Sequence, residues 1–437
     1  MSGDREPIGV IGVGWVGLVT AACFAELGHR VVARDIVAEK VEALSRGETT
    51  IHEPGLEALL KRNAERLTFT TDMGELLDGA RLLFVCVDTP PTRSGDADLS
   101  RVRSVVGDLR ADSGHVLIMK STVPAGTGES IRRDLRGLAY VSCPEFLKEG
   151  SAVEDFMHPD RVVIGADAGE EEAGEAVARL YEPLGGEIVR TDVASAEMIK
   201  LASNAFLATK ISFVNEIANV CEEVGADVAE VARGMGLDQR IGASFLRAGI
   251  GYGGSCFPKD VSALKMLAGN SGYHFQLLNA VIEVNELQKR RVVGKLQRHL
   301  GSLLGKRVAL LGLAFKPDTD DMREASSLVL AARLEGEGAE VVAYDPVAAE
   351  AARGLLGEVE FRDSALDALA GADAAVLVTE WPEFAELDWN EAAARMARPL
   401  LVDGRNFLDA NQLREAGFEY EGIGRAIEEP VPAGTTD

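Results

Sequence analysis

The sequence predicts an α/β protein built from two doubly wound domains joined by a long central helix. Three observations support this prediction. Strand and helix patterns alternate over the first 190 residues or so, a single helical pattern runs from Val193 to Val224, and the alternation restarts at Gly305. At 437 residues the chain can build several full cores. We expect domains at residues 1–192, 193–300 and 301–437.

The first domain opens with a dinucleotide-binding pattern. The apolar strand 8–11 leads directly into Gly12-Val13-Gly14-Trp15-Val16-Gly17, and a helix follows to about residue 27. In this motif Gly12 makes the tight turn, Gly14 admits a pyrophosphate and Gly17 allows close packing of helix on strand. The next strand, 30–34, ends in Asp35, whose carboxylate would bind the ribose hydroxyls and repel a 2′-phosphate. Both alternating domains are therefore expected to be Rossmann-like, and the first to prefer NAD over NADP.

Further strands of the first domain end in polar loops, where an open α/β sheet binds ligands. These strands are expected at residues 81–87, 116–119, 139–142, 161–165 and 187–190, with a helix at 171–181. Thr89 and Thr122 follow two of them and are either cofactor contacts or helix caps. Glu145 and Glu149 follow a third and suit water activation or sugar-hydroxyl binding, although a pair of surface glutamates explains them equally well.

The middle region is expected to be helical and to carry reactive groups. On the helix 193–224, Lys200 and Asn204 share one face, one turn apart. They form either a polar network at a dimer seam or a site that reaches into a cleft. The helix is mostly apolar, so we expect it to serve as core and as subunit interface. The helical pattern continues over 225–233 and breaks at Gly234, and one long helix is expected from 276 to about 300.

A cysteine in a glycine-rich loop is the most unusual feature of the chain. Residues 249–260 place four glycines in six positions ahead of Cys256, followed by Lys259 and Asp260. Asp260 is expected to cap a helix over 261–268, and a helix terminus with a nearby lysine favours the nucleophilic thiolate. NAD with a nucleophilic cysteine suggests oxidation at the aldehyde level through a thioester. The remaining cysteines, in or beside apolar runs, are expected to be buried structural residues: Cys23, Cys86, Cys143 and Cys221.

The last domain repeats the alternation without a second GxGxxG motif. Strands are expected at 306–311, 340–344, 374–378 and 400–402, and a helix at 326–334. The strand-end loops carry Lys316, Arg323 and Arg405. We expect this domain to hold something other than the dinucleotide, and the cations suggest a diphosphate substrate.

Composition excludes several classes of function. A formal net charge of −25 repels nucleic acid and acidic membrane surfaces. No apolar run approaches eighteen residues, and Met1–Pro7 is short and charged, without a signal-peptide core. Five cysteines without a CxxC pair argue against a disulfide framework and a zinc site, so we expect no metal and a reducing, cytoplasmic setting. The acidic, proline-containing tail after Ala426 is expected to be disordered.

In combination, several motifs resemble those of the UDP-glucose/GDP-mannose dehydrogenase family. They are GVGWVG, HEPGLEALL, KSTVPAGT, CPEFLKEG, AEMIKLASNAF, RIGASFLRAGIGYGGSCFPKD and GLAFKPDTDDMREAS, and they cover residues 8–425. The resemblance implies a four-electron oxidation of UDP-glucose to UDP-glucuronate. It further implies that two NAD⁺ and one water are consumed, and that the long helix forms a homodimer.

The resemblance also implies roles for individual residues. Cys256 would be the nucleophile, Lys200 and Asn204 would bind the oxyanion, Asp260 would orient or activate water, and Glu145 with Thr122 would assist the water-dependent steps. Cofactor contacts would be Gly12, Val13, Gly14, Trp15, Val16, Gly17, Asp35, Lys40, Thr89, Thr122, Glu149 and Arg323. Substrate contacts would be Glu145, Phe146, Leu147, Lys148, Glu149, Lys200, Asn204, Arg240, Phe245, Leu246, Arg247, Ala248, Gly249, Gly253, Lys316 and Arg405. Arg240 would reach the substrate of the neighbouring subunit.

Two positions differ from the pattern expected of the family. Asp88 stands where a small or amide residue is expected before Thr-Pro, and Arg34 precedes the ribose carboxylate. Rival substrates are GDP-mannose and UDP-N-acetylhexosamines. A two-electron hydroxyacid dehydrogenase also uses a GxGxxG motif with a Lys-x-x-x-Asn helix, but it needs no thiol. A non-catalytic sugar-nucleotide sensor is a further alternative.

Overall fold

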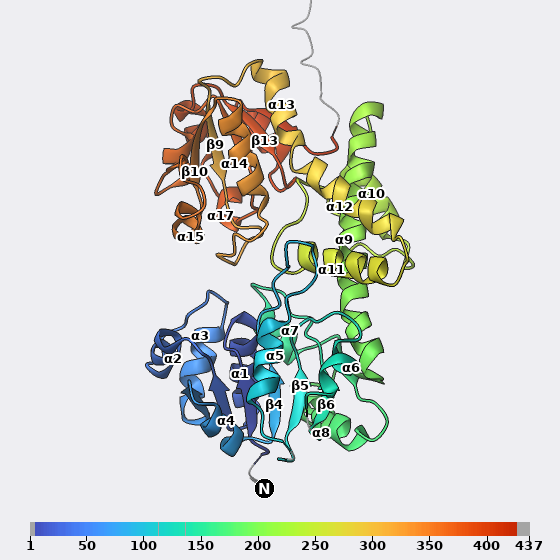
Figure 1. Cartoon of the computed structure of the whole chain (residues 1–437). Coiled ribbons are helices and arrows are strands. Elements are labelled where there is room, and N and C mark those ends of the chain that lie inside the picture. Colours follow the sequence, from blue (N-terminus) through green and yellow to red (C-terminus); the bar gives the residue numbers. More distant parts are fainter. Residues whose placement is uncertain (1–4, 112, 136, 426–437) are drawn as a thin grey trace, which may run out of the picture. The chain divides into compact units, whose positions relative to one another are not determined.

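The computed structural model describes residues 5–111, 113–135 and 137–425 (Figure 1). The first four residues and the acidic tail lie outside this range. The chain forms two compact units: unit 1 holds residues up to Asn204 together with Lys259–His274, and unit 2 holds Ala205–Pro258 and the chain from Phe275 onward. The α/β fold class predicted from the sequence is confirmed in both units.

Unit 1 is built on an eight-stranded sheet with the order β3-β2-β1-β4-β5-β6-β7-β8, parallel except for the β6–β7 pair. Alternate strand residues point to opposite faces, and each face is covered by its own hydrophobic cluster, as Phe84 and Leu83 of β4 illustrate. Its strands are β1 (Ile8–Ile11), β2 (Val31–Arg34), β3 (Leu67–Thr70), β4 (Leu82–Val85), β5 (Val116–Met119), β6 (Ala139–Ser142), β7 (Arg161–Gly165) and β8 (Glu187–Thr191). Its helices are α1 (Trp15–Glu26), α2 (Ala38–Ser45), α3 (Leu56–Arg62), α4 (Met73–Gly79), α5 (Ser100–Asp108), α6 (Thr127–Arg132), α7 (Ala152–Met157) and α8 (Glu171–Tyr181), with 3-10 turns η1 (Ala64–Arg66) and η2 (Glu182–Leu184).

Unit 2 is built on a six-stranded parallel sheet with the order β11-β10-β9-β12-β13-β14. Read from its own first strand, this order matches the first six positions of the unit 1 sheet, which is the doubly wound order of Rossmann folds. The strands are β9 (Arg307–Leu311), β10 (Glu340–Tyr344), β11 (Glu360–Phe361), β12 (Ala374–Leu377), β13 (Leu400–Asp403) and β14 (Glu419–Gly422). The helices that follow β9 are α14 (Ser326–Gly336), α15 (Ala349–Arg353), α16 (Ala365–Leu369), α17 (Pro382–Ala385), α18 (Trp389–Arg395) and α19 (Ala410–Glu415).

The predicted long helix is confirmed as α9 (Val193–Val224), and the boundary between the two units falls inside it, after Asn204. Two neighbouring predictions are wrong. The helix does not continue over 225–233, because Gly225 takes a left-handed φ of 75° and Asp227 caps a new helix, α10 (Val228–Gly236), which also runs through the predicted break at Gly234.

The helix predicted over 276–300 is in fact two helices, α12 (Gln276–Gln288) and α13 (Arg291–Leu300). The start of the helix after the cysteine loop is also wrong. α11 begins at Phe257 and runs to Asn270, so Asp260 lies in its first turn and is not its cap. Pro258 at the second position is the sequence signal for this start, since proline is well tolerated in a first helical turn.

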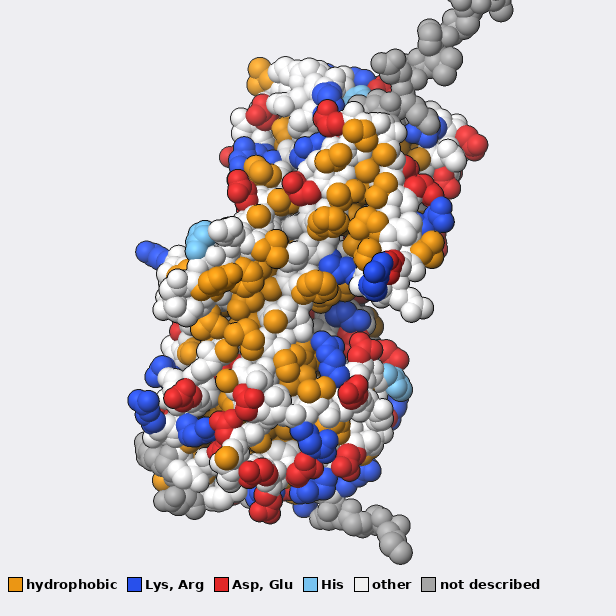
Figure 2. All heavy atoms as spheres, turned by 90° about the vertical axis from the view of Figure 1, so that its right-hand side faces the viewer, with side chains coloured by type: hydrophobic (Ala, Val, Ile, Leu, Met, Phe, Trp, Pro, Cys, Tyr) orange, Lys and Arg blue, Asp and Glu red, His pale blue; other side chains and the backbone are white. Residues whose placement is uncertain are grey.

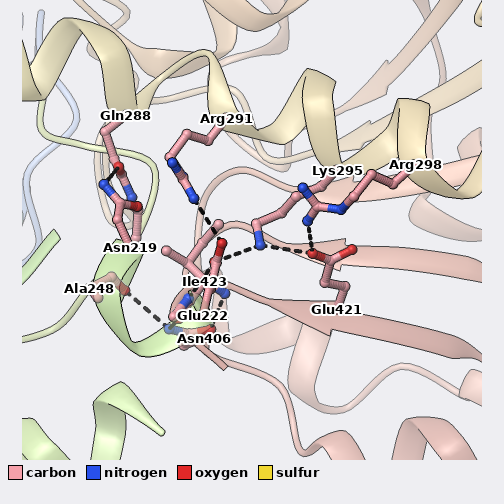
Figure 3. A network of polar contacts seen from close by, with 12 residues as sticks. Asn219, Glu222, Ala248, Gln288, Arg291, Lys295, Arg298, Asn406, Glu421 and Ile423 are labelled. Atoms are coloured by element: carbon pink, nitrogen blue, oxygen red, sulfur yellow. Dashed lines mark hydrogen bonds and ion pairs between the residues drawn. The ribbon is translucent and has the colours of Figure 1, made fainter. Parts of the chain in front are cut away.

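A buried ion network holds the second half of α9 inside unit 2 (Figure 3). The Glu222 carboxylate of α9 pairs with Lys295 of α13 at 2.6 Å, and Lys295 also pairs with Glu421 of β14 at 2.8 Å. Burial alone would raise the pKa of Glu222 and of Glu421, but the Lys295 ammonium and further hydrogen bonds outweigh it and lower both pKa values. The network therefore fixes a helix, a second helix and a strand that are far apart in the sequence.

Within the described ranges, none of the helices has the length and apolar composition needed to cross a membrane.

Candidate active site

The glycine loop between β1 and α1 fits a bound dinucleotide. Gly12 has a φ of 91°, and a Cβ on Gly17 would lie 1.8 Å from the Gly12 carbonyl oxygen, so both positions require glycine. A Cβ on Gly14, in contrast, would meet only the Asp88 Oδ1 atom, at 3.8 Å. The glycine at 14 is thus not needed for packing of the protein itself. Its missing side chain leaves the backbone open to a ligand, as the sequence pattern predicts.

Asp35, the predicted ribose carboxylate, lies buried at the end of β2. Its Oδ2 atom accepts a hydrogen bond from the Val13 N–H at 2.9 Å, and its Oδ1 atom accepts one from the Val37 N–H at 3.1 Å. Lys40 on α2 lies 3.6 Å from Oδ2. The structure therefore brings the predicted contacts Val13, Asp35 and Lys40 together. Arg34 points elsewhere, donating to the Thr71 carbonyl oxygen at 3.3 Å.

Glu53 is a site residue to which the sequence analysis gave no role. Its Oε2 atom accepts from the Trp15 indole N–H at 3.0 Å and from the Gly150 N–H at 2.8 Å, while Oε1 accepts from the Ala152 N–H at 2.8 Å. One buried carboxylate thus ties the glycine loop to the segment that follows Glu149. A glutamate ahead of a proline in HEPGLEALL gives no pattern from which this role could be read.

Thr89 and Thr122 lie side by side at the carboxyl edge of the sheet. The Thr89 hydroxyl donates to the Thr122 carbonyl oxygen at 2.8 Å, and the Ser121 hydroxyl donates to the Val87 carbonyl oxygen at 2.7 Å. Two strand-end loops are therefore joined directly. Neither threonine caps a helix in the structure, since α5 begins after Leu99 and α6 after Gly126.

Glu145 and Lys200 form a buried ion pair. Their side chains are 5% and 4% exposed, and Lys200 Nζ lies 3.0 Å from Glu145 Oε1. Burial alone would raise the pKa of Glu145, but the Lys200 ammonium and the Leu147 N–H outweigh it, so the pKa of this carboxyl is lowered. Phe146 lies beneath the ammonium, with its ring centroid 5.2 Å from Nζ. The structure thus joins two candidate residues that are 55 positions apart in the chain.

Asn204 and Asp260 are also brought together. The Asn204 amide donates to Asp260 Oδ2 at 2.6 Å, and Lys259 pairs with the other carboxylate oxygen. Asp260 is 1% exposed. Because Lys200 and Asn204 lie one turn apart on α9, each binds a different buried carboxylate from the same helix face. The polar face predicted for this helix therefore carries two donors, the Lys200 ammonium and the Asn204 amide.

Of the remaining candidates in unit 1, Val16 lies half-buried in α1, and the rest belong to the loop after β6. Lys148 is exposed and pairs with Asp155 at 2.9 Å, whereas Glu149 is half-buried.

Cys256 differs from the other four cysteines. It is partly exposed and directly precedes α11, with the Ser255 hydroxyl 3.6 Å from its Sγ atom. The other four are buried, as the sequence predicts. Burial raises the pKa of Cys23 and of Cys86 to about 12, and it also raises the pKa of Cys143 and of Cys221. These four thiols are therefore poor nucleophiles at neutral pH.

The segment leading to Cys256 packs on the sheet of unit 2. Leu246 and Ala248 point into the hydrophobic core of this unit, so only their backbone groups are available to a ligand. A Cβ on Gly249 would lie 2.8 Å from the Gly404 carbonyl oxygen, and one on Gly253 would lie 2.2 Å from that of Glu324. Here the glycines allow the chain to approach other backbone segments.

Arg405 holds this segment against two neighbouring loops of unit 2. Its guanidinium donates to the carbonyl oxygens of Val378 at 2.7 Å, Gly251 at 3.0 Å and Phe315 at 3.2 Å. Three loops at the carboxyl edge of the sheet are thus held by one side chain. Arg247 lies nearby, donating to the Asn406 carbonyl oxygen at 3.2 Å.

The other candidate residues of unit 2 lie in exposed or partly exposed positions. Arg323 and Arg240 each pair with an aspartate two positions earlier, Asp321 and Asp238, at 2.7 and 2.6 Å. Lys316 Nζ lies 5.5 Å from the Phe315 ring centroid, and Phe245 has a left-handed φ of 64°.

Comparison with known proteins gives a consistent result. Three sequence models of the UDP-glucose/GDP-mannose dehydrogenase family match the chain: the NAD binding domain at residues 6–185, the central domain at 194–287 and the UDP binding domain at 309–410. The UDP-glucose 6-dehydrogenase TuaD of Bacillus subtilis is 44% identical, with 96% of this chain and 93% of that protein covered. A UDP-glucose 6-dehydrogenase of Pseudomonas aeruginosa is 47% identical, over 95% of this chain and 97% of that protein. The solved structure of a UDP-glucose dehydrogenase from Pyrobaculum islandicum superposes with a TM-score of 0.89 at 38% identity and covers 98% and 99% of the two chains.

Proposed function

Because the chain belongs to the UDP-glucose/GDP-mannose dehydrogenase family, we propose that it oxidises UDP-glucose to UDP-glucuronate, consuming two NAD⁺ and one water. The observation that supports this most directly is the set of buried pairs Lys200–Glu145 and Asn204–Asp260 on one face of α9. A cationic ammonium and an amide are the donors that a developing oxyanion needs. We also propose the division of the chain into domains at 1–192, 193–300 and 301–437.

Apart from Arg323, which belongs to unit 2, the residues proposed to hold NAD lie in unit 1, in the glycine loop, in the strand-end loops of its sheet and, for Lys40, on α2. They are the loop itself (Gly12, Val13, Gly14, Trp15, Val16 and Gly17), with Asp35, Lys40, Thr89, Thr122, Glu149 and Arg323. NAD supplies the hydride acceptor for both oxidations. Asp35 carries a negative charge where NADP would place its 2′-phosphate, which supports a preference for NAD.

Cys256 is the proposed nucleophile. Oxidation of the C6 alcohol removes a hydride and a proton and leaves an aldehyde, to whose carbon the Cys256 thiolate adds. Lys200 and Asn204 donate to the resulting oxyanion, and Lys200 also serves as acid or base. Loss of a second hydride gives a thioester. Asp260, assisted by Glu145 and Thr122, activates the water that displaces the thiol and releases the carboxylate.

The UDP-sugar is proposed to bind along the segment that leads to Cys256 and to the loops around it. Arg247 offers a guanidinium, whereas Leu246 and Ala248 can contribute only backbone groups. The Gly249 N–H and carbonyl oxygen already bind Asn215 and Gln288, so this proposed contact would act by close approach alone. Arg405 would act mainly by holding three loops in place, since its guanidinium already serves three carbonyl oxygens. The remaining proposed contacts are Glu145, Phe146, Leu147, Lys148, Glu149, Lys200, Asn204, Arg240, Phe245, Gly253 and Lys316.

We further propose a homodimer that is located in the cytoplasm. Three apolar side chains recur every seven residues on α9: Phe206, Phe213 and Val220, which are 64%, 50% and 57% exposed. Hydrophobic side chains, drawn in orange, gather on the face that Figure 2 shows. An exposed apolar stripe of this kind favours pairing with a second copy. In such a dimer Arg240 would reach the substrate of the neighbouring subunit. Phe213→Glu is expected to yield monomers in light scattering, while Glu223→Gln, an exposed change on the same helix, leaves the dimer intact.

The test of the reaction is the amount of NADH released per UDP-glucose consumed. We expect a ratio near two for the wild type and stalled or aldehyde-level turnover for Cys256→Ser. A ratio near one with an unaffected variant would favour a two-electron hydroxyacid dehydrogenase. Faster turnover of GDP-mannose or a UDP-N-acetylhexosamine would reassign the substrate, and no NADH with any sugar nucleotide would favour a sensor.

A further inference from the structure

Glu197 is a buried carboxylate that the mechanism above does not use. It lies on α9 three positions before Lys200, and it is 2% exposed. Its Oε2 atom accepts from the Gly126 N–H at 2.7 Å, and its Oε1 atom accepts from the Gly128 N–H at 2.8 Å and from the Tyr140 hydroxyl at 3.3 Å. All three donors come from outside the helix. Two of them lie where the loop after β5 runs into α6: Gly126 precedes α6, and Gly128 lies in its first turn.

This loop is part of the candidate site. It begins where β5 ends, carries Thr122, and leads into α6. Its other end is packed tightly against α9, because a Cβ on Gly128 would lie 2.5 Å from the Val193 side chain and 2.6 Å from the Tyr140 ring. Such close packing leaves no room for a side chain between α9 and this stretch. The Glu197 carboxylate is the polar tie across this contact.

The tie uses both oxygens of the carboxyl group as acceptors. Burial raises the pKa of Glu197 to about 7, against the opposing effect of the Gly128 and Gly126 N–H groups. Tyr140 on β6 is the titratable group that donates to this carboxyl, and its own pKa responds to Arg132 on α6 and to Glu170. Arg132 is paired with Asp167 and Glu170. On α9 itself, Lys200 is paired with Glu145. A proton on Glu197 would replace one acceptor by a donor that faces an N–H group, and one bond to the loop would be lost.

We propose that Glu197 is a positioning residue for the oxidation, whose ionised carboxylate holds the Thr122 loop in register with the Lys200 and Asn204 face of α9. The inference rests on the proposed roles of those three residues. It predicts that the loop loosens, and turnover falls, when one of the two accepting oxygens is removed.

The variant Glu197→Gln keeps the shape of the side chain but cannot accept at both oxygens. We expect kcat to fall about tenfold, because small displacements of catalytic groups are costly, while KM for UDP-glucose and the Kd of NAD change less than about threefold. Tyr140→Phe removes only the longest bond and should have a much smaller effect. Glu175→Gln, an exposed change on α8, serves as the matched control.

A second measurement needs no substrate. At one fixed pH, hydrogen exchange of a peptide covering residues 123–131 should be faster in Glu197→Gln than in the wild type and unchanged in Glu175→Gln. Equal exchange of this peptide in Glu197→Gln and wild type would overturn the proposal, as would an unchanged kcat. If the wild type oxidises no UDP-glucose, the proposed function fails, whereas the exchange experiment still decides whether Glu197 holds the loop.

Discussion

The two sheets of this protein carry corresponding loops that are used in different ways. Gly12-Val13-Gly14 follows β1, and Gly312-Leu313-Ala314 follows β9. The neighbouring strand in each sheet ends in an aspartate, Asp35 or Asp345. The Gly12 and Gly312 N–H groups donate to equivalent positions, the carbonyl oxygen of the last residue of β2 (Arg34) and of β10 (Tyr344), each at 2.8 Å.

The difference lies in what the aspartate binds. Asp345 accepts from the Leu313 N–H at 2.6 Å and the Ala314 N–H at 3.1 Å, and from the Trp381 indole N–H at 3.1 Å. Asp35 accepts from only one N–H group of its loop, that of Val13, and lies beside Lys40. The second loop is also closed sterically, since a Cβ on Gly312 would lie 2.4 Å from the Thr379 side chain.

The comparison shows that sheet topology alone does not make a dinucleotide site. The same strand order supports a loop whose N–H groups are taken by its own aspartate and a loop whose glycine is open to a ligand. Three kinds of experiment test this difference. Each aspartate can be removed, one loop can be converted into the other, and buried carboxylates in each unit can be titrated.

The largest effect is expected from Asp345→Ala. Five donors lose their acceptor, including the Val347 and Ala348 N–H groups, so the free energy of unfolding of unit 2 should fall by about 4 kcal/mol. Denaturant unfolding followed by the fluorescence of Trp381 and Trp389, in a Trp15→Phe background, measures it.

The control for that experiment is Asp35→Ala, which deprives two N–H groups of an acceptor, those of Val13 and Val37. Its loss of stability should be clearly smaller. Equal losses in the two variants would mean that both aspartates are structural and that the comparison fails.

Gly14→Ala gives the first loop the side chain that Ala314 already has in the second. The added methyl group meets only Asp88 within the protein, so the fold should keep its stability within about 0.5 kcal/mol. The methyl group would occupy the approach of the pyrophosphate, and NAD affinity should fall about 100-fold in calorimetric titration. Gly107→Ala on α5, where a Cβ meets nothing within 4 Å, is the matched control. NAD binding by Gly14→Ala at wild-type affinity would contradict the proposed cofactor site.

The buried carboxylates of the two units should respond to pH in opposite directions. The pKa of Glu197 in unit 1 is raised from 4.5 to about 7, so its contribution to stability is complete below pH 4.5 and is lost as the pH rises through 7. From pH 8 to pH 5 the wild type should therefore gain about 2 kcal/mol relative to Glu197→Gln.

In unit 2 the pKa of Glu421 is lowered, so its contribution is present above pH 4.5 and is lost as the pH falls further. The advantage of the wild type over Glu421→Gln should then shrink only on acidification below that value. Unfolding midpoints of both variants against pH measure these slopes, and slopes of the same sign would refute the assignment.

The smallest effect is expected from Asp35→Asn. Loss of the charge should weaken NAD binding about tenfold and improve NADP binding, so that the preference for NAD narrows. Competition titrations with the two dinucleotides measure it, with Asp345→Asn as the control that should leave the preference unchanged. If Asp35→Asn prefers NAD over NADP as strongly as the wild type does, residues other than Asp35 must distinguish the two dinucleotides.

Much of the fold could be predicted from the sequence, because buried parallel strands are continuous apolar runs. The predicted strands 8–11, 116–119 and 139–142 agree with β1, β5 and β6 residue for residue, and the helix 171–181 agrees with α8. Edge elements were missed, since the strand β3 (Leu67–Thr70) is polar and half-exposed. The break between α12 and α13 was also missed. Neither glycine nor proline marks it, so tertiary packing must decide where α12 ends.

For the candidate site, sequence motifs identified the reactive side chains but not their partners. That Lys200 pairs with Glu145, and Asn204 with Asp260, is a matter of folded distance over 55 and 56 positions. Glu53 gave no signal beyond its charge, because a glutamate that binds backbone N–H groups needs no particular spacing in the chain. Glu197 shares the helical spacing of Lys200 and Asn204, but this spacing does not show which groups it binds. Helix capping rules selected Asp260 as a cap, whereas Pro258 was the correct indicator of the helix start.

The division of unit 1 into two stretches of chain has a consequence for synthesis on the ribosome. The partner of Asn204, Asp260, is 56 residues away, and the intervening residues Ala205–Pro258 belong to the other unit. At about 5–20 residues per second, roughly 3 to 11 seconds pass between the emergence of the two. During this interval the sheet of unit 1 can form but its last helix is missing, so the nascent chain exposes the polar face of α9 until residue 274 has been made.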